Sequence, residues 1–217
     1  MEQLETVRGI AAPLMQINID TDQIIPSRFM PRVLIPGGLK EGLFAEWRLT
    51  PEGADRPEFI LNREPYTHAP FLLVGRNFGC GSSREQAPKA LRQWGFRVVV
   101  APSFGEIFYG NCFRNGILPM VLPEAVVEAM AAAALADGAG AVLAVDLHRD
   151  VLTDALGAEH YFTSPARLRR MLLAGMDEID LTMTLAADMA AYRARDEKER
   201  AWSYGCVQGP DSSNRTA

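Results

Sequence analysis

A glycine-rich stretch, Asn77–Glu85 (NFGCGSSRE), gathers the residue types in this chain that could do chemistry. It places a cysteine between two glycines and follows them with two hydroxyls and a guanidinium, namely Gly79, Cys80, Gly81, Ser82, Ser83 and Arg84. Glycine permits positive φ angles and a close approach of the backbone to a ligand. The pattern therefore predicts a turn at a helix start that binds a carboxylate or a phosphate. Many such turns bind nothing, so a purely structural turn remains the alternative.

Three familiar loops do not fit this stretch. The phosphate loop GxxxxGK[ST] would need a glycine five residues after Gly75, where Cys80 stands. The dinucleotide pattern GxGxxG fails at Arg84, and its acid after the second strand is replaced by Pro102. The nucleophile elbow GxSxG fails because both serines follow the second glycine. What remains is an anion-binding turn that presents hydroxyls.

The flanking residues predict the elements that hold this turn. Short apolar runs indicate three buried strands, at Phe71–Gly75, Arg97–Ala101 and Ile117–Leu122. Capping boxes are expected to open the intervening helices, formed by Ser82 with Glu85 or Ser83 with Gln86, and by Ser103 with Glu106. Asn115-Gly116 is a typical helix end. Strands alternating with capped helices predict an α/β fold with a largely parallel sheet.

The remaining elements follow from the same patterns. Before the turn we expect a strand at Gly9–Ile19, a long loop at Pro26–Lys40 and a helix at Glu41–Leu49. After it we expect helices at Pro123–Ala136, Ser164–Gly175 and Thr184–Arg200, and short strands at Ala141–Leu147, Val151–Leu156 and His160–Thr163. The absence of a dividing linker predicts one domain over residues 1–200, followed by a flexible tail at 201–217.

Composition narrows the class of protein. The 217 residues are 48% hydrophobic and 23% charged, as in ordinary globular proteins. A net charge of −5 and the lack of a basic stripe argue against nucleic-acid binding. The first ten residues contain Glu2 and Glu5, unlike a signal peptide, and Glu128 and Asp137 interrupt the apolar stretch Ala125–Val145. We therefore expect a cytoplasmic protein that does not span a membrane.

The potential metal ligands are scattered. The cysteines are Cys80, Cys112 and Cys206, and none belongs to a CxxC pair. An odd number of cysteines suits a reducing compartment. The histidines, His68, His148 and His160, stand apart from other candidate ligands. We expect no metal site in this chain.

Four motifs in order carry a resemblance to a known family. They are Asn18–Pro26 (NIDTDQIIP), Asn77–Glu85, Ala101–Tyr109 (APSFGEIFY) and Asn115–Pro119 (NGILP). Through them the chain resembles the small subunits of 3-isopropylmalate dehydratase (isopropylmalate isomerase), in the aconitase family. The resemblance spans roughly residues 5 to 193 and implies a single swivelling β/β/α domain similar to the mobile C-terminal domain of aconitase.

The resemblance also implies site residues. Ser82 matches the family's base, Arg84 its substrate-binding arginine, and Ser83 would assist with its hydroxyl or amide. Asp22, within Thr21-Asp22-Gln23-Ile24, matches an active-site acid. Arg28 and Arg32, in the loop after Pro26, are plausible carboxylate contacts. Gln86 departs from the family, because many relatives carry histidine there, so the pH dependence of activity should differ.

The implied reaction is dehydration of a 2-hydroxy dicarboxylic acid and rehydration at the neighbouring carbon. Isopropylmalate, in leucine biosynthesis, is the first choice of substrate, and a citraconate/methylmalate or homoaconitate type is the alternative. The resemblance places a 4Fe-4S iron–sulphur cluster on a separate large subunit, with no cofactor in this chain. This chain would then be active only in that heterodimer. A non-catalytic anion-binding module is the second alternative.

Overall fold

The computed structural model describes residues 1–136 and 140–204. The chain divides into two compact units, Met1–Asp177 and Glu178–Ala217. The glycine-rich turn and every predicted site residue belong to the first unit. Most of the predicted tail at 201–217 lies outside the described residues.

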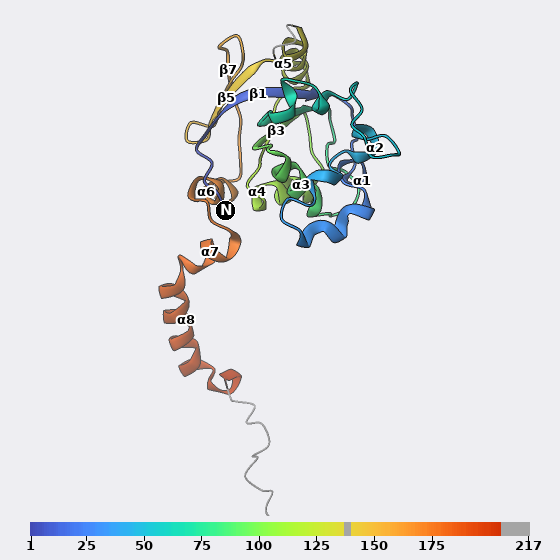
Figure 1. Cartoon of the computed structure of the whole chain (residues 1–217). Coiled ribbons are helices and arrows are strands. Elements are labelled where there is room, and N and C mark those ends of the chain that lie inside the picture. The colour runs from blue at the N-terminus through green and yellow to red at the C-terminus, as the bar shows by residue number, and fades with distance from the viewer. Residues whose placement is uncertain (137–139, 205–217) are drawn as a thin grey trace, which may run out of the picture. The chain divides into compact units, whose positions relative to one another are not determined.

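The first unit is built on one mixed sheet (Figure 1). Its strand order among the described residues is β4-β3-β2-β1-β5-β6-β7. The strands are β1 (Thr6–Leu14), β2 (Phe71–Val74), β3 (Val98–Ala101), β4 (Leu118–Val121), β5 (Val142–Asp146), β6 (Val151–Thr153) and β7 (Glu159–Tyr161). Strands β1 to β4 pair in parallel, whereas β1, β5, β6 and β7 pair antiparallel. The predicted parallel sheet around β2, β3 and β4 is confirmed.

Helices cover both faces of the parallel strands (Figure 1). They are α3 (Gln86–Trp94), α4 (Glu106–Arg114), α5 (Glu124–Ala136) and α6 (Ala166–Ala174). In β2, Leu72 and Val74 pack into a core with α3 and α4, while Phe71 and Leu73 pack into a second core that includes α5. Successive strand residues point to opposite faces, so a strand buried on both sides is apolar throughout. This is why the central strands are recognisable from sequence.

The connection from β1 to β2 consists of short helical pieces. They are α1 (Thr21–Ile24), α2 (Ala45–Arg48) and 3-10 helices at Ser27–Leu34, Lys40–Gly42, Ile60–Asn62 and Tyr66–His68. The expected loop at 26–40 is therefore largely 3-10 helix. The expected helix Glu41–Leu49 is wrong, because Phe44 takes a left-handed φ of 47° and breaks it. Phe44 is fully buried and stacks on Trp47, with ring centroids 5.8 Å apart.

The expected capping boxes do not form. Helix α3 begins at Gln86 with Glu85 as its N-cap, and α4 begins after Gly105; neither has a side-chain cap. The Ser103 hydroxyl instead accepts from the Asn77 amide at 2.9 Å. Helix α4 does end at Arg114, next to Asn115, as predicted. The first strand ends at Leu14, because the chain turns before Ile19.

The later elements agree with their predictions to within a few residues. Strand β6 stops at Thr153 because Asp154 accepts from the amides of Leu156 and Ala158 in a tight turn. Helix α6 ends at Gly175, which is left-handed with φ +65°.

The second unit contains α7 (Glu178–Met183), α8 (Ala186–Glu199) and a 3-10 turn at Ala201–Tyr204. The predicted helix Thr184–Arg200 thus begins two residues later, at Ala186. Asp196 ties its end together, accepting from Arg200 Nε at 2.6 Å and from the Tyr204 hydroxyl at 2.7 Å. Within the part of the chain that the structure describes, no helix is long and apolar enough to cross a membrane.

Candidate active site

Three loops meet at one edge of the parallel sheet. Strands β1, β2 and β3 all run in the same direction, so the loops that follow them, at residues 15–20, 75–85 and 102–105, leave from the same edge. Crevices at the carboxyl ends of such strands are the usual place for a ligand. Backbone hydrogen bonds join the loops, from Asn18 N to Arg76 O (2.9 Å), Gly79 N to Ile19 O (2.7 Å) and Phe78 N to Ser103 O (3.1 Å).

Glycines are required where the turn presses against α4. Gly79 has a φ of +71°, and a Cβ there would lie 2.2 Å from the Phe108 ring. A Cβ on Gly105 would lie 2.5 Å from the Gly79 carbonyl oxygen. The backbone of the turn is therefore packed directly on buried groups, which fixes the path of the residues from Cys80 to Arg84.

A capping box that we did not predict positions α1. Asp20 Oδ1 accepts from the Gln23 amide at 2.7 Å, and Gln23 Oε1 accepts from the Asp20 amide at 2.8 Å. The signal was present in the sequence, because an acid followed three residues later by glutamine is a capping pattern. The box places Thr21 and Asp22 in the first turn of α1, next to the glycine-rich turn.

Two side-chain contacts join α1 to that turn. The hydroxyls of Thr21 and Ser82 lie 3.0 Å apart, and Asp22 Oδ1 forms an ion pair with Arg84 Nη1. Thr21 is 1% exposed, whereas Ser82 and Ser83 are exposed to solvent. The structure thus places Asp22, Ser82 and Arg84 near one another, although Asp22 and Arg84 are 62 residues apart in the sequence. Their roles in catalysis stay a prediction.

The two predicted loop arginines have partners in their own segment. Arg28 pairs with Glu46, and Arg32 pairs with Glu41. Both guanidinium groups lie over the Phe29 ring, at 4.9 and 5.3 Å from its centroid. Their predicted role as carboxylate contacts would require them to exchange these partners.

The two described thiols, Cys80 and Cys112, are not part of a metal site. Cys112 is fully buried in α4, and burial raises the pKa of its thiol well above the ordinary value. Cys80 lies in the turn, with its sulphur 3.6 Å from the Asn18 carbonyl oxygen. Among residues 1–136 and 140–204, no three His, Cys, Asp or Glu side chains are grouped to hold a metal ion. Cys206 lies outside the described residues.

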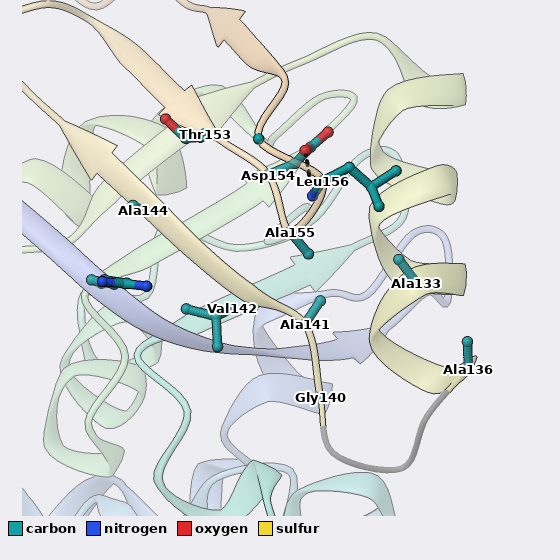
Figure 2. Close-up of a pocket in the computed structure, with 12 residues that line it drawn as sticks. Ala133, Ala136, Gly140, Ala141, Val142, Ala144, Thr153, Asp154, Ala155 and Leu156 are labelled. Atoms are coloured by element: carbon teal, nitrogen blue, oxygen red, sulfur yellow. Dashed lines mark hydrogen bonds between the residues drawn. The ribbon is translucent and has the colours of Figure 1, made fainter.

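A hollow of about 760 Å³ is lined by other residues, from β1, β5, β6 and α5. Figure 2 shows that its walls are mainly small apolar side chains, such as Ala133, Ala141 and Val142. Asp154, the one acidic residue of this lining, already has hydrogen-bond partners: its Oδ1 accepts from two backbone amides of its own turn, and its Oδ2 lies 2.9 Å from His160 Nε2. The carboxyl edge of the sheet therefore carries the better candidate for acid–base chemistry.

Comparison with known families agrees with this fold. The family model described as the aconitase C-terminal domain matches residues 1–125, more than half of the chain. The chain belongs to the aconitase C-terminal domain family. The match contains the whole carboxyl edge with Asp22, Ser82 and Arg84.

The similar proteins define a narrower group. The chain is 50% identical to the 3-isopropylmalate dehydratase small subunit of Cupriavidus necator, over 93% of this chain and 98% of the relative. It is 46% identical to the subunit of that name from Rhodospirillum centenum, over 94% of this chain and all of the relative. A crystal structure of 3-isopropylmalate dehydratase from Methanocaldococcus jannaschii matches 86% of this chain and 99% of its own, with a TM-score of 0.62 and 26% identity.

Proposed function

We propose that this chain is the small subunit of a 3-isopropylmalate dehydratase, which interconverts 2-isopropylmalate and 3-isopropylmalate in leucine biosynthesis. The observation that carries this proposal is similarity over nearly the full length of small subunits with that name, at up to 50% identity. The enzyme is a hydro-lyase of the aconitase family. The relatives' names favour isopropylmalate over the citraconate/methylmalate and homoaconitate types.

Ser82 acts as the base in this proposal. The reaction takes a proton from the carbon beside a carboxylate and hydroxide from the neighbouring carbon, and then adds water back the other way round. Ser82 is exposed at the carboxyl edge, where a substrate has access to its hydroxyl. Ser82 can accept a proton only after its hydroxyl has lost its own proton, and the resulting alkoxide needs strong stabilisation, which the Arg84 cation and the amides of the turn can supply. The negative charge of Glu85, the residue after Arg84, is partly balanced by the Lys89 ammonium, whose Nζ lies 3.1 Å from Glu85 Oε1.

Arg84 and Ser83 hold the substrate's carboxylate. A guanidinium can bind a carboxylate through two parallel hydrogen bonds, and Arg84 is already held at the turn by Asp22. Substrate binding would therefore make Arg84 share its donors between Asp22 and the ligand, with Asp22 fixing the guanidinium plane. Arg28 and Arg32 lie on the 3-10 helix Ser27–Leu34, and we propose them as further contacts to the substrate's carboxylates. To bind substrate, each would have to break its ion pair, Arg28 with Glu46 and Arg32 with Glu41.

The relatives' designation as small subunits implies a large-subunit partner. We place the 4Fe-4S cluster on that partner, because the described thiols, Cys80 and Cys112, do not fit a cluster that needs several spaced thiolates. When bound there, the cluster supplies the Lewis acid that accepts the substrate's hydroxide. The two unpaired thiols also support a reducing, cytoplasmic location.

The test is reconstitution with a 3-isopropylmalate dehydratase large subunit under anaerobic conditions. Turnover is measured on a panel of 2-isopropylmalate, methylmalate and homocitrate, for the native chain and for Ser82→Ala. We expect isopropylmalate to be preferred and Ser82→Ala to lower turnover by orders of magnitude. The melting temperature of the isolated Ser82→Ala chain should equal that of the native chain, since one exposed hydroxyl contributes little to stability. Preference for another hydroxy acid of the panel would reassign the substrate, turnover by the chain alone would refute the partnership, and near-native turnover by Ser82→Ala would remove its role as base.

A further inference from the structure

The Thr21 hydroxyl contacts Ser82 from the protein interior. Thr21 Oγ1 lies 3.0 Å from Ser82 Oγ and 3.2 Å from the Ser82 carbonyl oxygen. The Thr21 amide donates to the Cys80 carbonyl at 3.0 Å, which fixes its backbone against the same turn. Thr21 is 1% exposed and Ser82 is exposed, so a substrate would approach Ser82 from the side opposite Thr21.

The single hydrogen of the Thr21 hydroxyl has two possible acceptors, both on Ser82. While Ser82 is protonated, its own hydrogen can be donated to Thr21 Oγ1, and the Thr21 hydrogen can go to the Ser82 carbonyl. Once Ser82 is an alkoxide, the Thr21 hydrogen is better placed on that oxygen, because a hydrogen bond to an anion is about twice as strong as a neutral one. A rotation about the Cβ–Oγ1 bond of Thr21 moves its hydrogen from one acceptor to the other.

The exchange leaves no polar group without a partner. The Ser82 carbonyl also accepts from the Arg84 amide at 2.9 Å, so it keeps a donor when Thr21 turns away. A carbonyl left without any donor would oppose the rotation. The second donor removes that obstacle.

We propose that Thr21 is a positioning residue whose hydroxyl switches its hydrogen bond from the Ser82 carbonyl to the Ser82 alkoxide and thereby stabilises the base. The inference rests on the proposed function, in which Ser82 takes the substrate's proton. The protons balance as follows: Ser82 first loses its hydroxyl proton to solvent, to which it is exposed, and the resulting alkoxide then takes the proton from the substrate carbon. Thr21 keeps its own proton throughout. Thr21 contacts Ser82 and not the substrate, so its effect should fall on turnover and not on substrate binding.

The test compares Thr21→Val, which keeps the side-chain shape but lacks the hydroxyl, with Thr21→Ser, which keeps the hydroxyl. In the assembled enzyme we expect Thr21→Val to lower kcat by about tenfold to a hundredfold, the range for losing one hydrogen bond to a charged group, with KM changed less than about twofold. Thr21→Ser should retain most of the turnover. Thr67→Val is the control: Thr67 donates to Glu64 elsewhere, and its removal should change neither constant.

A double mutant separates this inference from the proposed function. If Thr21 acts through Ser82, adding Thr21→Val to Ser82→Ala should cause no further loss of turnover. Native kcat in Thr21→Val, equal changes in kcat and KM, or failure of Thr21→Ser to restore turnover would overturn the role of Thr21 alone. Near-native turnover of Ser82→Ala would overturn the base assignment instead. Should Thr21→Val not assemble, Thr21→Ala replaces it in the same comparison with Thr21→Ser.

Discussion

Gly79 offers a direct test of how tightly the glycine-rich turn is packed. Its φ of +71° is unfavourable for any residue with a Cβ, and a Cβ there would lie 2.2 Å from the Phe108 ring. The ring cannot move aside easily, because Phe108 is 2% exposed and packs edge-on against Phe78, with centroids 5.3 Å apart. Gly79→Ala should therefore carry two separate penalties.

The magnitude follows from adding the two. A left-handed conformation costs an ordinary residue about 1–2 kcal/mol, and forcing a methyl group into a packed core costs about 1–3 kcal/mol. We expect Gly79→Ala to lower the free energy of unfolding by about 2–5 kcal/mol. Gly81 is the matched control: its φ is +88°, but its nearest neighbour would be 3.4 Å from a Cβ. Gly81→Ala should therefore lose only the conformational part, about 1–2 kcal/mol.

Urea denaturation of the isolated chain measures both variants. The midpoints should fall in the order native, Gly81→Ala, Gly79→Ala, with unchanged slopes, because the surface exposed on unfolding is the same. Equal losses for the two variants would show that the Phe108 ring yields to the methyl group. A loss below about 1 kcal/mol for Gly79→Ala would refute the conformational penalty as well.

Other predictions concern binding and assembly. Arg84→Lys should raise KM by about tenfold to a hundredfold, since an ammonium cannot form the paired hydrogen bonds of a guanidinium; Arg76→Lys, in the same loop but with Glu124 as its ion-pair partner, serves as the control and should have little effect. Leu34→Glu should weaken assembly with the large subunit, or raise KM, without altering the unfolding of the isolated chain, because Leu34 is 89% exposed. Leu156→Glu, at a leucine 90% exposed between β6 and β7, should leave pull-down by the large subunit unchanged, and equal effects of the two would refute a specific surface. Gln86→His should shift the pH–rate profile, and identical profiles would contradict that expectation.

The sequence alone determined the central strands and the place of the turn. Phe71–Val74 and Val98–Ala101 are buried on both faces, so their apolar character is continuous and local. The ends of α4 and α6 were also predictable, because Asn115 and Gly175 are residues that favour helix termination. The motif order pointed to Asp22, Ser82 and Arg84, which the structure brings together.

Only the tertiary structure decided where the hydroxyls and the helix starts lie. Ser82 and Ser103 follow local capping patterns, yet both bind partners elsewhere: Ser82 contacts Thr21, and Ser103 accepts from Asn77. A local pattern records which bonds a side chain can make with its neighbours in the chain. It does not record a competing partner 61 residues away, and that partner reaches the side chain only when the fold brings the three loops together.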